Sequence, residues 1–134
     1  MIAALLAALT LGGANPVAPT PKPITTLAGE WRVAGIDGKP VAGPVGLALR
    51  GNRSKIWWEP SCAGLLRRYT IRASRISISG YRKDEAPTLI CLIAPPREMA
   101  DVFAVLDAAK RIRRTENNGV EISGGGHSLL LFSQ

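Results

Sequence analysis

The chain has 134 residues, of which 46% are hydrophobic and 20% are charged, the composition of one globular domain with a single core. Its 17 lysines and arginines outnumber its 10 aspartates and glutamates, and the resulting net charge of +7 favours anionic partners. One histidine and two cysteines are too few for a closed zinc site, which takes four such ligands, so we expect no metal and no cofactor.

Residues 1–14, MIAALLAALTLGGA, have the pattern of a secretory signal peptide, although no basic residue precedes the apolar run. The run covers residues 2–11, and small residues follow it up to Ala14, the expected cleavage point. It is shorter than the roughly 20 residues that a membrane-spanning helix requires, so we expect no integral membrane span. The pattern predicts an exported protein, either periplasmic or secreted.

Residues 15–26 are rich in proline, with Pro16, Pro19, Pro21 and Pro23. Proline favours an extended backbone, so this segment is expected to be a linker. The folded domain then covers residues 27–134.

The first part of the domain is a series of short segments in which apolar and polar residues alternate, the pattern of strands with one buried face. Turn-forming pairs such as Asp37-Gly38 and Gly51-Asn52 separate them. We expect strands at residues 31–36, 45–50, 55–58, 69–74, 76–79 and 88–93, and a final hairpin at residues 120–123 and 128–132. The glycines at 124–126 are expected to form the turn of that hairpin.

The pattern changes after residue 96, where four apolar side chains recur at helical spacing: Met99, Val102, Phe103 and Leu106. Acidic residues lie near the start of this segment and basic residues near its end, as the helix dipole favours. We therefore expect one helix at about residues 97–110, with Lys110 and Arg111 in or beside its last turn. The fold class is mainly β, a strongly curled antiparallel sheet or small barrel of seven or eight strands, with this helix before the last hairpin.

Cys62 and Cys91 are expected to form a disulfide, because two cysteines in an oxidising compartment usually pair. Closing that loop in the unfolded chain would stabilise the fold by roughly 3.5 kcal/mol in a chain-entropy estimate. For a domain of this size such a bond is a large part of the total stability.

The order of these elements, with several residues, resembles the META/HslJ-like domain family. The resemblance begins with Leu27-Ala28-Gly29-Glu30-Trp31 and continues with the turn at residues 37–41. It then includes a cysteine with a tyrosine seven positions on, and a threonine shortly before a second cysteine: Cys62, Tyr69, Thr88 and Cys91. Three features differ from the usual family pattern: Ala63 replaces an asparagine, Arg67 replaces a glycine, and Thr88 lies three residues before Cys91 where the family commonly has four. The resemblance implies a small envelope or secreted β-rich domain, often tied to stress responses, without known catalytic residues.

Catalytic groups are few in the sequence. A serine or cysteine nucleophile needs a base, and His127 is the only histidine, placed beside the predicted final hairpin. Glu98 and Asp101 are better explained as helix-dipole partners than as a catalytic pair. The glycines at 124–126 lack the lysine of a phosphate-binding loop. We therefore expect no enzymatic activity and no catalytic residues.

The adjacent Trp57 and Trp58 lie in one predicted strand, whose neighbouring residues point to opposite faces. One tryptophan should enter the core and the other should face outward. An exposed tryptophan would form an aromatic and cationic patch with four nearby residues: Arg53, Lys55, Arg67 and Arg68. Such a patch suits carbohydrate, acidic peptide or nucleic acid, the last disfavoured by the exported location. The alternative is that the second tryptophan lies under a loop or the linker.

The functional expectation is an exported, non-enzymatic binding or stress-support domain, a monomer whose partner is a protein or an anionic surface ligand and not nucleic acid. The alternative is an inhibitor of a secreted protease or lysozyme. Residues 15–26 could serve as its wedge, because some small periplasmic barrels with a similar Leu-Ala-Gly-x-Trp start inhibit metalloproteases with an extended N-terminal segment. A lipid or small-molecule carrier is a third class, disfavoured because so short a chain should fill its own centre.

Overall fold

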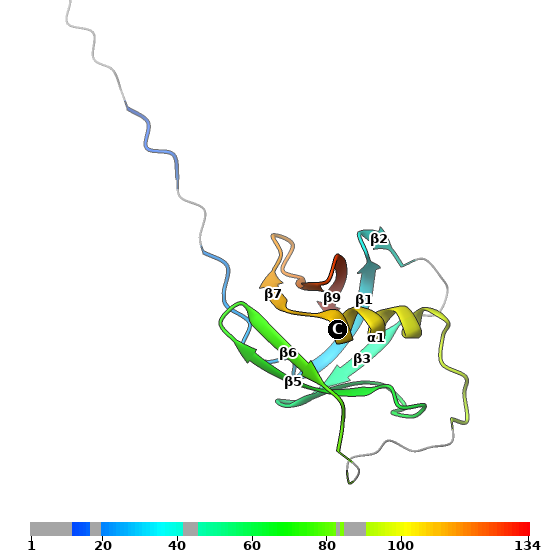
Figure 1. Cartoon of the computed structure of the whole chain (residues 1–134). Helices are drawn as coiled ribbons and strands as arrows, with labels where there is room; N and C mark the ends of the chain where they lie inside the picture. Colours follow the sequence, from blue (N-terminus) through cyan, green and yellow to red (C-terminus); the bar gives the residue numbers. More distant parts are fainter. Residues whose placement is uncertain (1–11, 17–19, 42–45, 83, 85–90) are drawn as a thin grey trace, which may run out of the picture.

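Figure 1 shows the computed structural model, in which a curled sheet encloses the core and a helix lies across it. The structure describes residues 12–16, 20–41, 46–82, 84 and 91–134. Within these ranges the strands are β1 (Gly29–Ile36), β2 (Lys39–Pro40), β3 (Ala48–Gly51), β4 (Lys55–Trp58), β5 (Leu66–Arg72), β6 (Arg75–Ser79), β7 (Arg111–Arg114), β8 (Val120–Gly124) and β9 (His127–Ser133), and the helix is α1 (Glu98–Ala108).

The strands form a closed antiparallel barrel of eight strands, in which each strand pairs with the next along the chain. The barrel closes because β1 pairs with β3 along one edge and with β9 along the other. The two-residue β2 pairs with the far end of β1 and is additional to this ring. The join between β6 and β7 is the shortest, with Arg75 opposite Arg111 as its paired residues. The predicted mainly β fold, with its helix ahead of the final strands, is confirmed.

Large apolar side chains fill the interior of the barrel. Alternate residues of each strand point inward, so the period-two pattern of the sequence becomes a continuous core. The largest of the fully buried side chains are Leu27, Leu49, Ile56, Met99, Val102, Leu106, Val120, Ile122, Leu129 and Leu131. The centre of the barrel is therefore occupied by the protein's own side chains.

Helix α1 lies close to the predicted range and packs against β6, β8 and β9. It ends at Ala108, and the extended Ala109 turns the chain back toward the sheet. The helix thus ends slightly before the predicted limit of about residue 110, because the Lys110 N–H donates to the Ser123 carbonyl and Arg111 begins β7. A side chain at Gly124 would approach the Ala108 carbonyl oxygen to 2.1 Å, so glycine is required where the helix end meets β8.

The strand predicted at residues 88–93 is wrong over residues 91–93, which form no ladder. Leu92 is 97% exposed and Ile93 63% exposed, so the apolar run does not face the core there. Residues 88–90, and most of the predicted signal peptide, lie outside the described residues. Cys91 is held by its disulfide to Cys62 of the β4–β5 loop, a constraint that alternation along the sequence does not encode.

That disulfide joins Cys62 to Cys91 as predicted, with their Cα atoms 5.4 Å apart. Cys62 lies in the loop between β4 and β5 and is buried in the core, whereas Cys91 is partly buried against it. The bond therefore connects the β4–β5 loop to the segment that leads into α1.

The start of β1 is fixed by contacts of the side chain, the N–H and the carbonyl of Leu27. Its side chain is fully buried, and its N–H donates to the Tyr69 hydroxyl at 2.7 Å. Its carbonyl oxygen accepts a hydrogen bond from Trp31 Nε1 at 2.8 Å. The same oxygen lies so close to β3 that a side chain at Gly51 would meet it at 2.2 Å. The contacts of the Leu27 to Trp31 motif therefore fix the position of the start of β1 at the end of the barrel.

The Tyr69 hydroxyl connects three separate segments. It donates its single proton to the Asn52 carbonyl at 2.5 Å, so it acts as acceptor for the Leu27 N–H and for the Thr26 hydroxyl at 3.1 Å. The Thr26 oxygen in turn accepts from the Ala28 N–H at 3.0 Å. This one group thereby holds the chain before β1, the β3–β4 turn and β5 together.

The segment expected to be a linker, residues 15–26, is not uniformly separate from the barrel. Ile24 is buried in the core, and the Lys22 carbonyl accepts a hydrogen bond from Arg114 Nε at 3.1 Å. Residues 12–16 are exposed and lie on the extended arm that leads away from the barrel in Figure 1. The chain therefore attaches to the domain a few residues before the start of β1.

Replacing Tyr69 by phenylalanine should reduce the free energy of unfolding by about 1–3 kcal/mol, because the buried Leu27 N–H loses its acceptor. Urea unfolding monitored by circular dichroism measures the loss. The same change at the partly exposed Tyr81 is the control and should cost less than about 0.5 kcal/mol. Equal effects at both tyrosines would contradict the role assigned to the Tyr69 hydroxyl.

Replacing Cys62 or Cys91 by alanine should reduce the free energy of unfolding by similar amounts, about 2–5 kcal/mol, because either change opens the same loop. The double variant should lose little more than either single variant. Urea unfolding of the oxidised proteins tests this pattern. Single-variant losses that simply add in the double variant would mean that the two cysteines stabilise the fold separately.

Candidate functional site

The two adjacent tryptophans separate to opposite faces of β4, as predicted. Trp58 is 6% exposed and belongs to the core, whereas Trp57 is partly exposed on the outside of the barrel. Trp57 Nε1 donates to Glu59 Oε2 at 3.1 Å, and its cross-strand partner is Arg50. Arg50 is itself paired with Glu30. The outward tryptophan is therefore bordered on this side by charges that already compensate one another.

Lys55 and Arg68 lie on the other side of Trp57 and share its face. Lys55 is two residues before Trp57 in β4, and Arg68 of β5 is the direct cross-strand partner of Lys55. Arg53 is exposed in the turn before β4. Three cations of the predicted patch therefore lie on the same outer face as Trp57 or at its edge.

Arg67 is not part of that surface. Its cross-strand partner is Ile56, a core residue, so the Arg67 side chain leaves β5 on the inner face. There it makes two bonds to Asp107 of α1, from Nε to Oδ1 at 2.6 Å and from Nη2 to Oδ2 at 3.1 Å. The guanidinium also lies 5.1 Å from the Phe103 ring centre. Arg67 thus fixes the helix to the barrel, a structural role that the sequence pattern did not indicate.

Three arginines that the sequence analysis did not group lie side by side on the outside of the barrel. Arg72 of β5 is directly opposite Arg75 of β6, and Arg75 is directly opposite Arg111 of β7. All three side chains are exposed. The two-residue turn Ala73-Ser74 could have indicated the first pairing from the sequence. Arg111 could not have been added, because no strand was predicted at residues 111–114.

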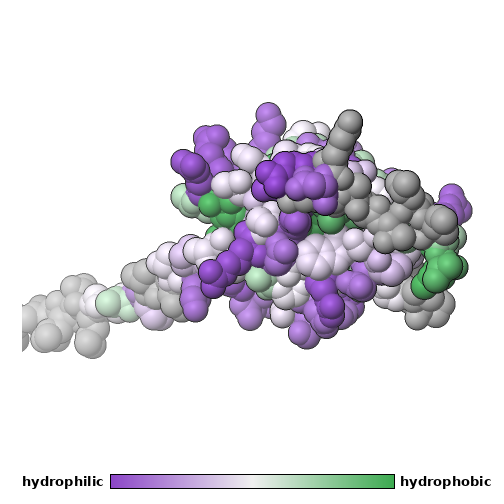
Figure 2. Space-filling view, turned by 90° about the horizontal axis from the view of Figure 1, so that it is seen from below, coloured by the Kyte–Doolittle hydropathy of each residue, from purple (hydrophilic) through white to green (hydrophobic). Residues whose placement is uncertain are grey.

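Figure 2 shows hydrophilic residues over much of the face in view, with apolar colour confined to small areas. This agrees with the outward arginines and lysines of the barrel strands. No helix in the described part of the chain is both long enough and apolar enough to cross a membrane.

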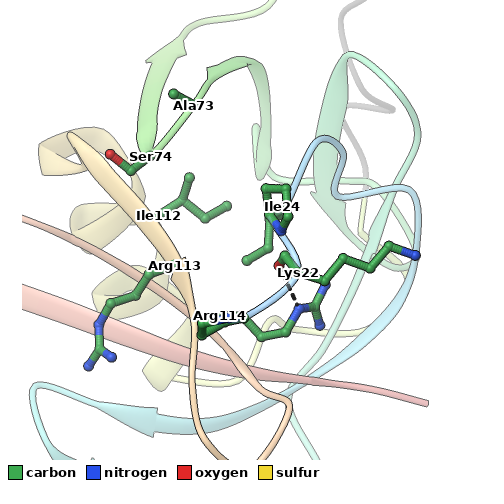
Figure 3. A pocket seen from close by; sticks show the side chains of 9 residues that line it. Lys22, Ile24, Ala73, Ser74, Ile112, Arg113 and Arg114 are labelled. Atoms are coloured by element: carbon green, nitrogen blue, oxygen red, sulfur yellow. Dashed lines mark hydrogen bonds between the residues drawn. The ribbon is translucent and has the colours of Figure 1, made fainter. Parts of the chain in front are cut away.

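A cavity of about 350 Å³ opens at one end of the barrel, between the proline-rich segment, the β5–β6 turn and β7. Figure 3 shows Ile24 and Ile112 on its apolar side and Arg114 at its rim. The Arg114 guanidinium is occupied by the Lys22 carbonyl and by Asn118 Oδ1, the latter at 3.0 Å. Arg113 points away from the cavity in Figure 3 and pairs with Glu121 at 2.9 Å on the outer face. The cavity therefore offers mainly apolar contact.

His127 faces a carboxylate on the surface. Its Nδ1 lies 3.1 Å from both oxygens of Asp37, and the Ser128 N–H donates to Asp37 Oδ1 at 3.0 Å. The Ser128 hydrogen bond and then the His127 contact lower the pKa of the Asp37 carboxyl from its ordinary value. This arrangement joins the β1–β2 turn to the start of β9, so the histidine serves as a turn contact there.

Groups that could bind metal are scattered in the described ranges. No set of three histidine, cysteine, aspartate or glutamate side chains there is close enough to hold a metal ion. Both cysteines are joined to each other. The chemistry that the described residues do gather is the cationic outer surface of β4 to β7.

Comparison with known proteins yields no relative: no family model matches the sequence, and neither the curated proteins nor the solved structures contain a significant match.

Proposed function

We propose that this chain is an exported, non-enzymatic binding domain of META/HslJ-like type, periplasmic or secreted, whose partner is anionic. The partner meets the outside of the barrel over a cationic face, which we define as Lys55, Trp57, Arg68, Arg72, Arg75 and Arg111. The signal-like residues 1–14 and the disulfide support the exported location. An exported protein does not meet nucleic acid in the cell, so the anion belongs to another class of molecule.

The observation that carries this proposal is the contrast between the two faces of the sheet. Inside, apolar side chains fill the barrel. Outside, Lys55 and Arg68 lie near Trp57, and a second group of three arginines, Arg72, Arg75 and Arg111, lies further along β5 to β7 beyond Thr70. Cations around an aromatic ring attract anions while the ring supplies stacking area. A single convex face with this composition is suited to a surface ligand more than to an enclosed small molecule.

The contacts of the histidine and of the cysteines support the proposal that the domain is not an enzyme. His127 contacts Asp37, and Cys62 is bonded to Cys91. Neither contact joins a nucleophile to a base, which acyl transfer requires. A monomer is the expected state, and its binding would depend on the electrostatic match between two surfaces.

The alternative function, inhibition of a secreted protease or lysozyme, is favoured by one observation. After the expected cleavage point at Ala14, residues 15–16 and 20–23 are exposed, and the buried Ile24 anchors the chain after them. An arm tethered to a rigid barrel could enter an enzyme cleft. A panel of secreted proteases and lysozymes that shows no inhibition at micromolar protein would eliminate this alternative.

Titration with heparin, a soluble polyanion, should change the tryptophan fluorescence, because Trp57 is the outward tryptophan whereas Trp31 and Trp58 are buried. The double variant Lys55→Gln with Arg68→Gln should weaken binding about tenfold, and Trp57→Phe should remove the signal. The matched control, Arg32→Gln with Lys39→Gln, removes the same charge from other exposed positions and should weaken binding less than about twofold. Equal weakening would mean that net charge alone attracts heparin, and a natural protein that binds neither heparin nor any other anionic probe would refute the anionic partner.

A further inference from the structure

We propose that Arg72, Arg75 and Arg111, which we call the arginine row, form a binding site for phosphate groups on the outside of the barrel. This deepens the function proposed above, and rests on it, by naming phosphate as the anion and the row as its site.

The backbone fixes where the three side chains point. Each arginine is adjacent in sequence to an isoleucine whose position is on the inner face: Ile71, Ile76 and Ile112. Because neighbouring strand residues face opposite ways, all three arginines project outward from three consecutive strands. Adjacent strands lie about 4.8 Å apart, so the row extends over about 10 Å.

The row is unfavourable for the protein alone. Like charges directly opposite each other across strands destabilise a sheet, and Arg75 has such a neighbour on both sides. Among the described residues, no acidic side chain forms an ion pair with Arg72, Arg75 or Arg111. A bound anion would remove this repulsion, which is the reason to expect one there.

Arg113 provides the contrast within the same strand. It lies two residues after Arg111, on the same outer face of β7, and its direct partner on β8 is Glu121. The two side chains form an ion pair at 2.9 Å. On β7, one outward arginine is thus neutralised by the fold, whereas the other joins two further arginines.

Phosphate fits the row in charge and in geometry. A guanidinium presents parallel N–H donors that match two oxygens of one phosphate. A phosphodiester headgroup, or a linking group of a condensed phosphate, carries about one negative charge at neutral pH, so about three such groups balance three arginines. The position opposite Arg111 on β8 is Ser123, whose hydroxyl can donate to a further oxygen. Phosphate groups in sequence, on a condensed phosphate or on lipid headgroups, therefore match the row.

The test compares Arg75→Gln, at the centre of the row, with Arg113→Gln, which removes the same charge from the neighbouring ion pair. Tripolyphosphate binding is measured by calorimetry, and vesicles of phosphatidylglycerol, with phosphatidylcholine as the neutral reference, by cosedimentation. Arg75→Gln should weaken binding of at least one phosphate probe about tenfold, because it removes one charge-assisted contact. Arg113→Gln should weaken it less than about twofold. Binding of tripolyphosphate identifies free condensed phosphate as the source, and binding of vesicles alone identifies lipid headgroups.

A second measurement distinguishes a ligand site from a structural one. Without ligand and at low salt, Arg75→Gln should raise Tm by about 2 °C, because it relieves the repulsion from Arg72 and Arg111. Arg113→Gln should not raise it. A lower Tm in Arg75→Gln would assign the row to fold stability and overturn the inference.

Three further results would overturn the inference. The first is equal weakening of phosphate binding by the two variants. The second is binding of polygalacturonate, a carboxylate polymer, with the same dependence on Arg75 while both phosphate probes fail. The third is tighter binding of a single-stranded oligonucleotide than of either phosphate probe. If the natural protein binds heparin but fails these tests, only the inference falls. If it binds neither heparin nor any phosphate probe, the proposed function falls as well.

Discussion

The hydrogen bond from the Leu27 N–H to the Tyr69 hydroxyl fixes the start of β1, the strand whose two pairings close the barrel. A barrel closes only if its first strand can pair on both edges, and β1 does so with β3 and β9. Leu27 sets the position from which β1 starts, because its side chain, amide and carbonyl are all engaged, and the Gly51 position leaves room for that carbonyl. The motif Leu-x-Gly-x-Trp therefore has a physical meaning here: it holds the first strand in register for closure.

Closure has a consequence for function. In the described part of the chain, closure pairs every barrel strand on both sides, apart from residues 76–79 of β6 beyond its single pair with β7, and apolar side chains fill the centre. Recognition is therefore left to the outer face, the loops and the mouth. The helix is held firmly by the bidentate contact of Arg67 with Asp107, and the disulfide restrains the segment that leads into it. Arginines on paired strand positions of such a scaffold keep their spacing without a ligand. This preorganisation lowers the entropy cost of binding an anion.

Much of the fold follows from local patterns, and the failures have identifiable physical causes. Alternation predicted the separation of Trp57 from Trp58, and the exported context predicted the disulfide. The strand β7 was not predicted, because four residues with a single inward side chain, Ile112, give too short an alternation to read beside a helix; its pairing with β8 is what defines it. Arg67 was read as a surface cation, since its contact with Asp107 joins residues forty positions apart. The arginine row was missed because Arg111 lies in β7, the strand that was not recognised.

The most direct measurement is a map of chemical shift changes in isotopically labelled protein as tripolyphosphate is added. The account predicts the largest changes at the backbone amides and side-chain N–H groups of Arg72, Arg75 and Arg111, with the methyl groups of Leu129 and Leu131 unaffected. Changes concentrated instead in those core methyl groups, or at Ile24 and Ile112 in the mouth cavity, would contradict the claim that this closed barrel binds its ligand on the outside.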